Sequence, residues 1–199
     1  GDIWLLLRPL AYAHHPYQWP AIGKDIKHVE QAELHDVKDF FHRYYGPNNA
    51  ILSLSGNVDA EQTFKLAEKW FGPLDSRPVL RHQYPAEPVQ NQPKRLEVLR
   101  QVPNDVIYMA FHMGGRQERD FYLGDVLSDI LSSGPSSRLF RRFIKEEQIF
   151  TEVNAFITGD LDPGLFVFMA KTVPGVSLET AEQKLWEEIT KIQSELISE

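Results

Sequence analysis

Residues 150–172 read FTEVNAFITGDLDPGLFVFMAKT, and this stretch decides the fold of the second half of the chain. Two runs rich in β-branched and aromatic residues, 150–158 and 165–172, flank the turn-forming residues 159–164. Runs of this composition separated by a Gly/Asp/Pro cluster predict two strands joined by a turn. We therefore expect two adjacent strands here.

Helical periodicity surrounds this strand pair. Three helices are predicted, at 118–131, from the cap Ser136 to about Gln148, and at 178–197 behind the cap Ser177. Upstream, residues 95–101 and 106–113 are expected to pair as strands across a turn at Pro103 and Asn104. The second half therefore has the predicted order ββααββα.

The first half has the predicted order ααβα, which looks like the tail of the same pattern. Its elements are helices at 2–13 and 30–45, a strand at 50–55, and a helix from the cap Asp59 to the stop at Gly72. Pro9 should kink the first helix or move its start. We expect an α+β protein of two sister α/β domains, the first truncated: residues 1–75, a Pro-rich linker at 76–93, and a sister domain at 94–199 whose completeness at its C-terminus is open.

Composition describes an ordinary globular protein that is acidic overall. Of the 199 residues, 42% are apolar and 25% are charged, and the net charge is -7. An acidic balance argues against a nucleic-acid-binding protein, which usually presents a basic face. The absence of cysteine excludes thiol catalysis, disulfides and cysteine-ligated metal. No run of about 18 apolar residues occurs, so we expect no transmembrane helix. The compartment stays open, with the bacterial periplasm and cytoplasm both compatible.

The histidines do not form a known metal motif. His28, His35 and His42 are seven residues apart, so neighbours on one helix lie roughly 10 Å apart along its axis. One zinc ion cannot bridge that distance, because a zinc–nitrogen bond is about 2 Å long. The sequence also has no His-x-x-x-His, His-x-x-Glu-His, nucleophile elbow or Gly-rich nucleotide loop. Taken alone, the residues predict two α+β domains without a visible active site.

Five segments between about residues 12 and 155 resemble, in the right order, the pitrilysin/insulinase family of zinc peptidases. They are HPYQWPAIG at 15–23, ELHDVKDFFHRYY at 33–45, the strand region from PNNA to GNVD at 47–59, FGPL at 71–74 and LSSGPSSRLF at 131–140. The resemblance implies a zinc-bearing first domain with a His-x-x-Glu-His motif and a distal Glu, in which the motif Glu is the general base. It also implies peptide substrates, held in a chamber that is closed by a second homologous half or subunit.

In the family order, the zinc ligands and the base lie upstream of the loop at 15–23, and nothing here matches them. The resemblance therefore implies that residues 1–75 are the rear of the zinc-bearing domain and that the second domain is its non-zinc sister. The parent protein would be a zinc metalloendopeptidase. This chain would hold no zinc and no catalytic residue, and it would be inactive alone.

Four residues are candidate substrate contacts by resemblance: His15, Tyr17 and Trp19 in the loop, and Arg138 at the helix start. For each of them a purely structural role is the alternative. Family enzymes often supply an Arg and a Tyr from the opposite half, and the equivalents here are Ile144 and Thr151. Ile donates no hydrogen bond and Thr is short. This half therefore resembles the zinc-bearing half, but it also fits a catalytically dead paralogue serving as scaffold or partner subunit. A free-standing interaction module is the third alternative.

Overall fold

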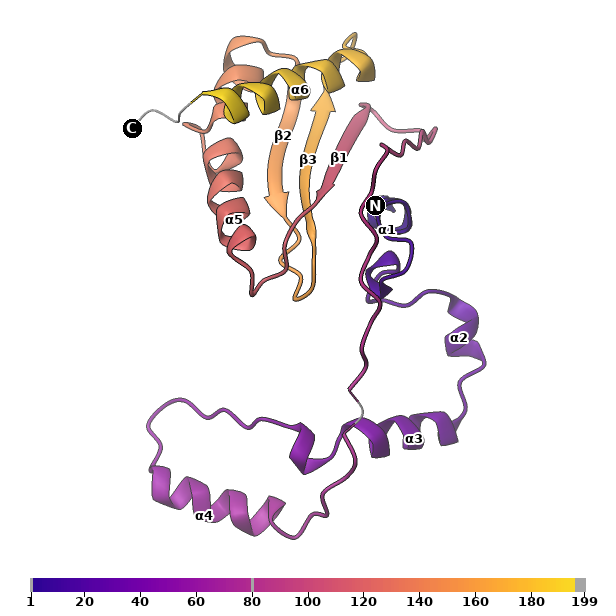
Figure 1. The fold of residues 1–199 in the computed structure, drawn as a ribbon, viewed down its shortest axis with the longest axis vertical. Helices are drawn as coiled ribbons and strands as arrows, with labels where there is room; N and C mark the ends of the chain where they lie inside the picture. Colours follow the sequence, from indigo (N-terminus) through magenta and orange to yellow (C-terminus); the bar gives the residue numbers. More distant parts are fainter. Residues whose placement is uncertain (1, 80, 196–199) are drawn as a thin grey trace. The chain divides into compact units, whose positions relative to one another are not determined.

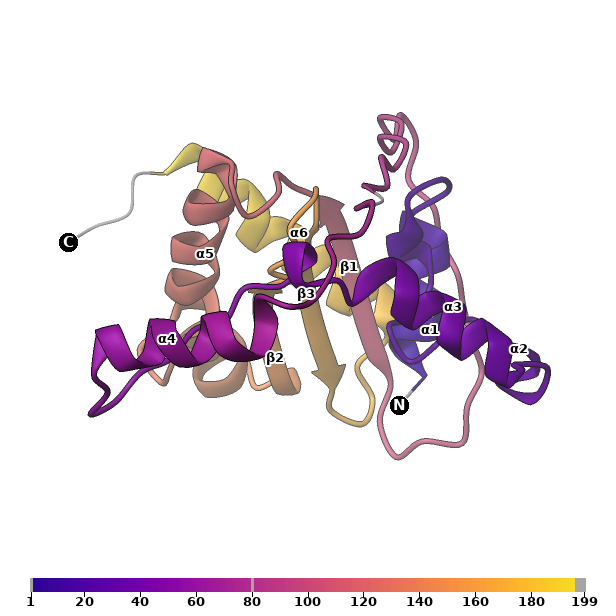
Figure 2. The ribbon, with the colours of Figure 1, turned by 90° about the horizontal axis from the view of Figure 1, so that it is seen from below.

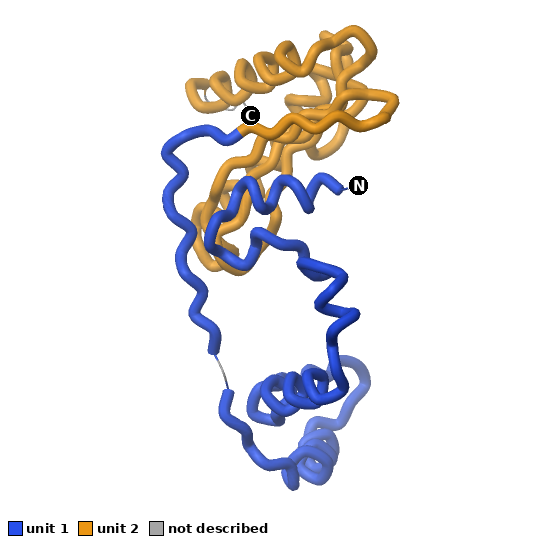
Figure 3. Tube along the Cα trace, turned by 90° about the vertical axis from the view of Figure 1, so that its right-hand side faces the viewer, with its two compact units in different colours: residues 1–94 blue, residues 95–199 orange. Residues whose placement is uncertain are grey.

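The computed structural model describes residues 2–79 and 81–195. The chain divides into two compact units, Gly1–Lys94 and Arg95–Glu199, which Figure 3 distinguishes by colour. Unit 1 is built from helices and extended segments, whereas unit 2 packs helices on an antiparallel sheet. The expected α+β class is confirmed.

A three-stranded sheet forms the centre of unit 2 (Figure 1). Its strands are β1 (Val106–His112), β2 (Phe150–Ile157) and β3 (Leu165–Thr172), and the spatial order is β1-β3-β2 with both pairs antiparallel. The β2–β3 pair is the one predicted from the sequence. The expected pairing of 95–101 with 106–113 is wrong, because β1 pairs with β3 and residues 95–101 form no strand.

Three helices accompany this sheet: α5 (Arg119–Ser132), the π-helix η3 (Phe140–Glu146) and α6 (Leu178–Ser194). In Figures 1 and 2, α5 lies beside β2 and α6 crosses the sheet. Ser177 caps α6 as predicted, since its hydroxyl accepts a hydrogen bond from the amide of Thr180. The last two residues of the predicted helix, 196–197, lie outside the described residues.

The core of unit 2 lies between these helices and one face of the sheet. Alternate residues of each strand point to this face, as the two-residue period of a strand requires. The sheet contributes Ala155 and Phe168, which are partners in the β2–β3 register, and the helices contribute Phe143 and Leu185. All four are at most 4% exposed. Burying a Phe or Leu side chain stabilises a fold by about 1.5–3 kcal/mol, so Phe143, Phe168 and Leu185 contribute most to holding the unit together.

The helix predicted from Ser136 to Gln148 differs from the prediction. The backbone is helical from residue 138 and follows π geometry over η3, with the amide of Glu147 bonded to the carbonyl of Arg142, five residues earlier. A π-helix is a rare, widened form of helix that hydrophobic periodicity does not distinguish from an α-helix. Its widening changes which side chains of this segment face α6.

Unit 1 contains four α-helices and two short 3-10 helices in the described residues. They are α1 (Ile3–Ala11), η1 (Pro16–Gln18), α2 (Ile26–Glu30), α3 (Leu34–Tyr44), η2 (Pro47–Asn49) and α4 (Ala60–Phe71). Asp59 caps α4 as predicted, by accepting a hydrogen bond from the amide of Gln62. Pro9 lies inside α1, so the expected later start is wrong. The short helix α2 was not predicted.

The strand expected at 50–55 is absent, and the described residues of unit 1 form no sheet. Ile51, Leu52 and Leu54 are exposed. A strand is stable only when its backbone groups pair with a neighbouring strand, and within residues 2–79 and 81–94 no strand lies beside this segment. Within the described part of the chain, no helix is long and apolar enough to span a membrane.

Candidate functional site

The loop after α1 carries three of the four candidate substrate contacts. His15 precedes η1, and its Nδ1 accepts a hydrogen bond from the amide of Tyr17 at 3.3 Å. Pro16 occupies the first position of η1, where its fixed φ and missing N–H suit a helix start. The sequence HPY therefore folds into one rigid turn, which brings the His15 and Tyr17 rings to a centroid distance of 4.2 Å.

Burial separates the three loop candidates. The His15 side chain is 7% exposed and packs edge-on against Tyr17 and Tyr84, and Tyr17 is half-buried. Trp19 is 37% exposed, with the ammonium of Lys24 lying 5.1 Å from its ring centroid. The loop thus offers an exposed aromatic surface at Trp19, while His15 has a packing role in the described structure.

A carboxylate that the sequence did not single out holds this loop in place. Glu87 accepts hydrogen bonds from three successive amides, those of Ala13 (2.6 Å), His14 (2.9 Å) and His15 (2.9 Å). Burial opposes ionisation of this side chain, but the three amide bonds outweigh it and the pKa of Glu87 lies below its ordinary value. Its partners are more than 70 residues away in sequence, so no local pattern could reveal it.

Arg138, the fourth candidate, belongs to unit 2 and takes part in an ionic network between the η3 segment and α6. Its Nε donates to Glu188 at 2.7 Å, and Arg142 Nη1 donates to the other oxygen of the same carboxylate at 3.0 Å. Arg142 also binds Glu147 at 2.7 Å, and Lys184 binds Glu147 at 2.9 Å. The Arg138 side chain is 29% exposed, whereas that of Glu188 is 4% exposed.

Metal-binding chemistry finds no support among the described residues. No group of three or more His, Cys, Asp or Glu side chains in 2–79 and 81–195 could hold a metal ion. The His35 side chain, 66% exposed, instead lies beside the exposed carboxylates of Glu33 and Asp36. The His82 ring bonds to the Tyr44 hydroxyl at 2.7 Å. These ligand types do not converge as a zinc site requires.

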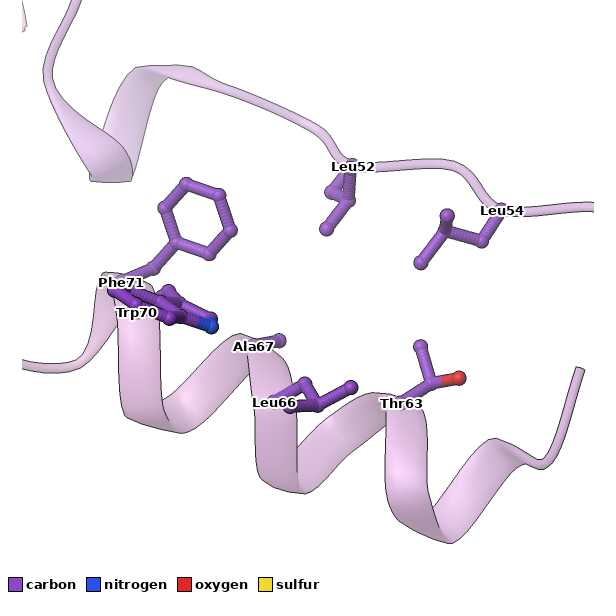
Figure 4. Close-up of a pocket in the computed structure, with 7 residues that line it drawn as sticks. All are labelled: Leu52, Leu54, Thr63, Leu66, Ala67, Trp70 and Phe71. Atoms are coloured by element: carbon purple, nitrogen blue, oxygen red, sulfur yellow. The ribbon is translucent and has the colours of Figure 1, made fainter.

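An apolar groove runs between α4 and the extended segment that carries Leu52 and Leu54 (Figure 4). Its volume is about 240 Å³. Thr63 contributes a polar side chain, and the other lining side chains are apolar: Leu52, Leu54, Leu66, Ala67, Trp70 and Phe71. Leu66 and Trp70, two of the apolar residues of α4 at this groove, are 48% and 67% exposed.

The fold and the motifs now define the class of the protein. Residues 31–199 match the family model described as the peptidase M16 inactive domain. The chain therefore belongs to the pitrilysin/insulinase family of peptidases, as its motifs indicated.

Two curated relatives are named as zinc proteases. The chain is 26% identical over 178 residues to the zinc protease PqqE of Helicobacter pylori, and 25% identical over 183 residues to an uncharacterized zinc protease of Mycobacterium leprae. Each alignment covers 88% of this chain, but only 40% and 39% of the respective relative.

Solved structures support the fold. A protease from Helicobacter pylori matches with a TM-score of 0.88 at 24% identity, over 100% of this chain and 48% of that one. A peptidase M16 inactive domain from Pseudomonas fluorescens matches with a TM-score of 0.79 at 20% identity, over 96% of this chain and 46% of that one. At these identities the matches establish the fold, and any chemical role has to be argued from the residues of this chain.

Proposed function

We propose that this chain is part of a zinc-dependent endopeptidase that hydrolyses peptides inside an enclosed chamber. The chain has a structural role in that enzyme and carries none of its zinc ligands. The observation that carries the proposal is the match of residues 31–199 to a peptidase family, together with two relatives named zinc proteases. The chain spans about 40% of the length of those relatives. The proposal includes a second homologous half or subunit as the partner that closes the chamber.

Within this proposal the zinc ligands and the general base belong to another part of the longer protein, and the chain is inactive alone. The supporting observation is that the described histidines and carboxylates do not fit zinc. We derive no catalytic step through the metal from these residues. Trp19, exposed at the end of the η1 turn, is the loop candidate best placed to touch a peptide, whereas His15 is buried against Tyr17 and Tyr84.

The test compares the longer protein with the 199-residue chain. The longer protein should hold one zinc ion per molecule and cleave an internally quenched peptide, and a chelator should abolish cleavage until zinc is restored. The chain alone should do neither after demetallation and reconstitution with zinc. One tightly held ion in the isolated chain would contradict the proposal. A longer protein without zinc and without cleavage would favour the alternative, a catalytically dead paralogue that acts as scaffold or partner subunit.

A further inference from the structure

The Pro-rich segment predicted as a linker at 76–93 makes side-chain contacts with other residues of unit 1. We call residues 81–94 the strap. His82 bonds to the Tyr44 hydroxyl at 2.7 Å, and the Tyr84 ring packs on His15 at a centroid distance of 5.7 Å. Lys94 Nζ donates to the carbonyl of Leu10 at 2.9 Å. Between these contacts, Glu87 binds the loop after α1, so the strap is held at successive points along the unit.

The Glu87 contact differs from the others because three successive backbone amides converge on one carboxylate. The helix α1 ends at Ala11, and the amide of Tyr12 still bonds back to Arg8. The next three amides, at residues 13–15, lie beyond the helix and point at one carboxylate. Successive backbone N–H groups arranged in this way form a nest, which binds anions. Both oxygens of Glu87 are used, one by Ala13 and the other by His14 and His15.

The nest also fixes the aromatic turn that follows it. His15 supplies the third amide of the nest, while its ring accepts the hydrogen bond that closes η1. A change in the backbone at residues 13–15 would therefore move the rings of His15 and Tyr17. Glu87 thus connects the strap to the conformation of the HPY turn.

We propose that the backbone amides of residues 13–15 form a carboxylate-binding nest and that Glu87 is its internal ligand. By binding there, Glu87 holds the strap against the loop that follows α1. This inference goes beyond the proposed peptidase function and does not depend on it. The nest selects a carboxylate for two reasons. It offers three donors to two anionic oxygens, and hydrogen bonds to charged acceptors are about twice as strong as neutral ones. An amide at position 87 would have one acceptor oxygen and would turn an N–H₂ group toward an N–H donor.

The experiment follows hydrogen exchange of the amides of residues 13–15 by NMR in the 199-residue chain. Glu87→Ala should raise these exchange rates by at least about tenfold, since charge-assisted bonds are lost, while the amides of the unit 2 core keep theirs. Sodium acetate should restore protection in Glu87→Ala with a saturable dependence, and it should leave the wild type unchanged because its nest is filled. Acetamide and sodium chloride at equal concentration should not restore it.

Glu87→Gln, which keeps the size of the side chain, should lose protection as Glu87→Ala does. Glu61→Ala is the matched control, because it removes a carboxylate whose ion pair, with Lys65, lies at the surface. Unchanged exchange at residues 13–15 in both Glu87 variants would overturn the proposal. So would a failure of acetate to restore protection, or equal restoration by chloride.

Discussion

Arg142 Nη1 lies 3.0 Å from Glu188 Oε2, and this contact joins the π-helix η3 to α6. The other oxygen of Glu188 accepts from Arg138 at 2.7 Å, so one carboxylate, whose side chain is 4% exposed, pairs with two guanidinium groups. Arg142 in turn reaches Glu147 and Glu187. A buried charge is tolerated only when it is paired and hydrogen-bonded. The network therefore determines how η3 sits on the final helix.

Glu188→Gln should destabilise unit 2 by about 3 kcal/mol, the usual cost of removing one partner of a buried ion pair. The substitution keeps the shape of the side chain but leaves two cations against a neutral group. Urea unfolding followed by circular dichroism measures the change. Glu152→Gln is the matched control, because its pair with Lys171 lies at the surface, with side chains 46% and 40% exposed, and surface pairs contribute at most about 1 kcal/mol. Equal, small effects from both substitutions would show that the network does not hold η3.

Arg138 should behave as a structural residue. Arg138→Ala and Glu188→Gln should be non-additive in stability, with a coupling energy of about 0.5–3 kcal/mol, because the two side chains share one hydrogen bond. A double-mutant cycle by urea unfolding measures this coupling. If Arg138 binds peptide instead, Arg138→Ala would leave stability unchanged and raise the KM of the longer protein.

Acid should weaken the same network. Burial opposes ionisation of Glu188, but hydrogen bonds from Arg138 and Arg142 outweigh it, so the pKa of this carboxyl lies below its ordinary value of 4.5. The pKa of Glu147 is lowered in the same way by Lys184 and Arg142. A depressed carboxyl pKa gives stability that is present above the unfolded value and lost as the pH falls through the folded value.

The unfolding free energy of the wild type should therefore fall as the pH drops below about 4.5. Glu188→Gln should show a shallower dependence over the same interval, because one of the titrating groups is missing. Urea titrations at successive pH values measure both curves. Parallel curves would mean that Glu188 does not contribute to acid sensitivity.

Local sequence predicted the parts of the fold that local contacts build. The β2–β3 pair, the helix after Ser177 and the Asp59 cap depend on residues close together in the chain. The partner of β1 could not be predicted, because Val106 pairs with Lys171 across 65 positions. The residues around Pro103 do not close a hairpin. Asn104 instead donates to the carbonyl of Thr172 at 3.0 Å, which ties that turn to the end of β3.

In the candidate site, too, local features were predictable from the sequence and long-range contacts were not. The HPY turn was visible in sequence, because Pro16 and the aromatic rings mark a rigid loop. The contact that fixes it was not, since Glu87 carries no local signal and its amide partners lie 72 to 74 residues away. Arg138 was visible only through the family resemblance, and its partner Glu188 lies 50 residues later on a different helix.

Apolar side chains exposed along α4 should make the isolated chain self-associate. Trp70 is 67% exposed at the groove, and Phe64 is 75% exposed on the same helix. Large contiguous apolar surface is uncommon on monomers and is normally covered by a partner. In light scattering, the chain should therefore have a mass above the 23.0 kDa of one molecule, and the mass should rise with concentration.

Trp70→Glu should shift this association toward the monomer by at least about tenfold in concentration, because a buried aromatic side chain contributes more than about 1.4 kcal/mol at an interface. Gln62→Glu adds the same negative charge to α4 but removes no apolar surface, so it should associate like the wild type. Circular dichroism of both variants checks that the helices are retained. A wild-type chain that stays at 23.0 kDa at every concentration would contradict the prediction, and the exposed face of α4 would then be stable in water without a partner.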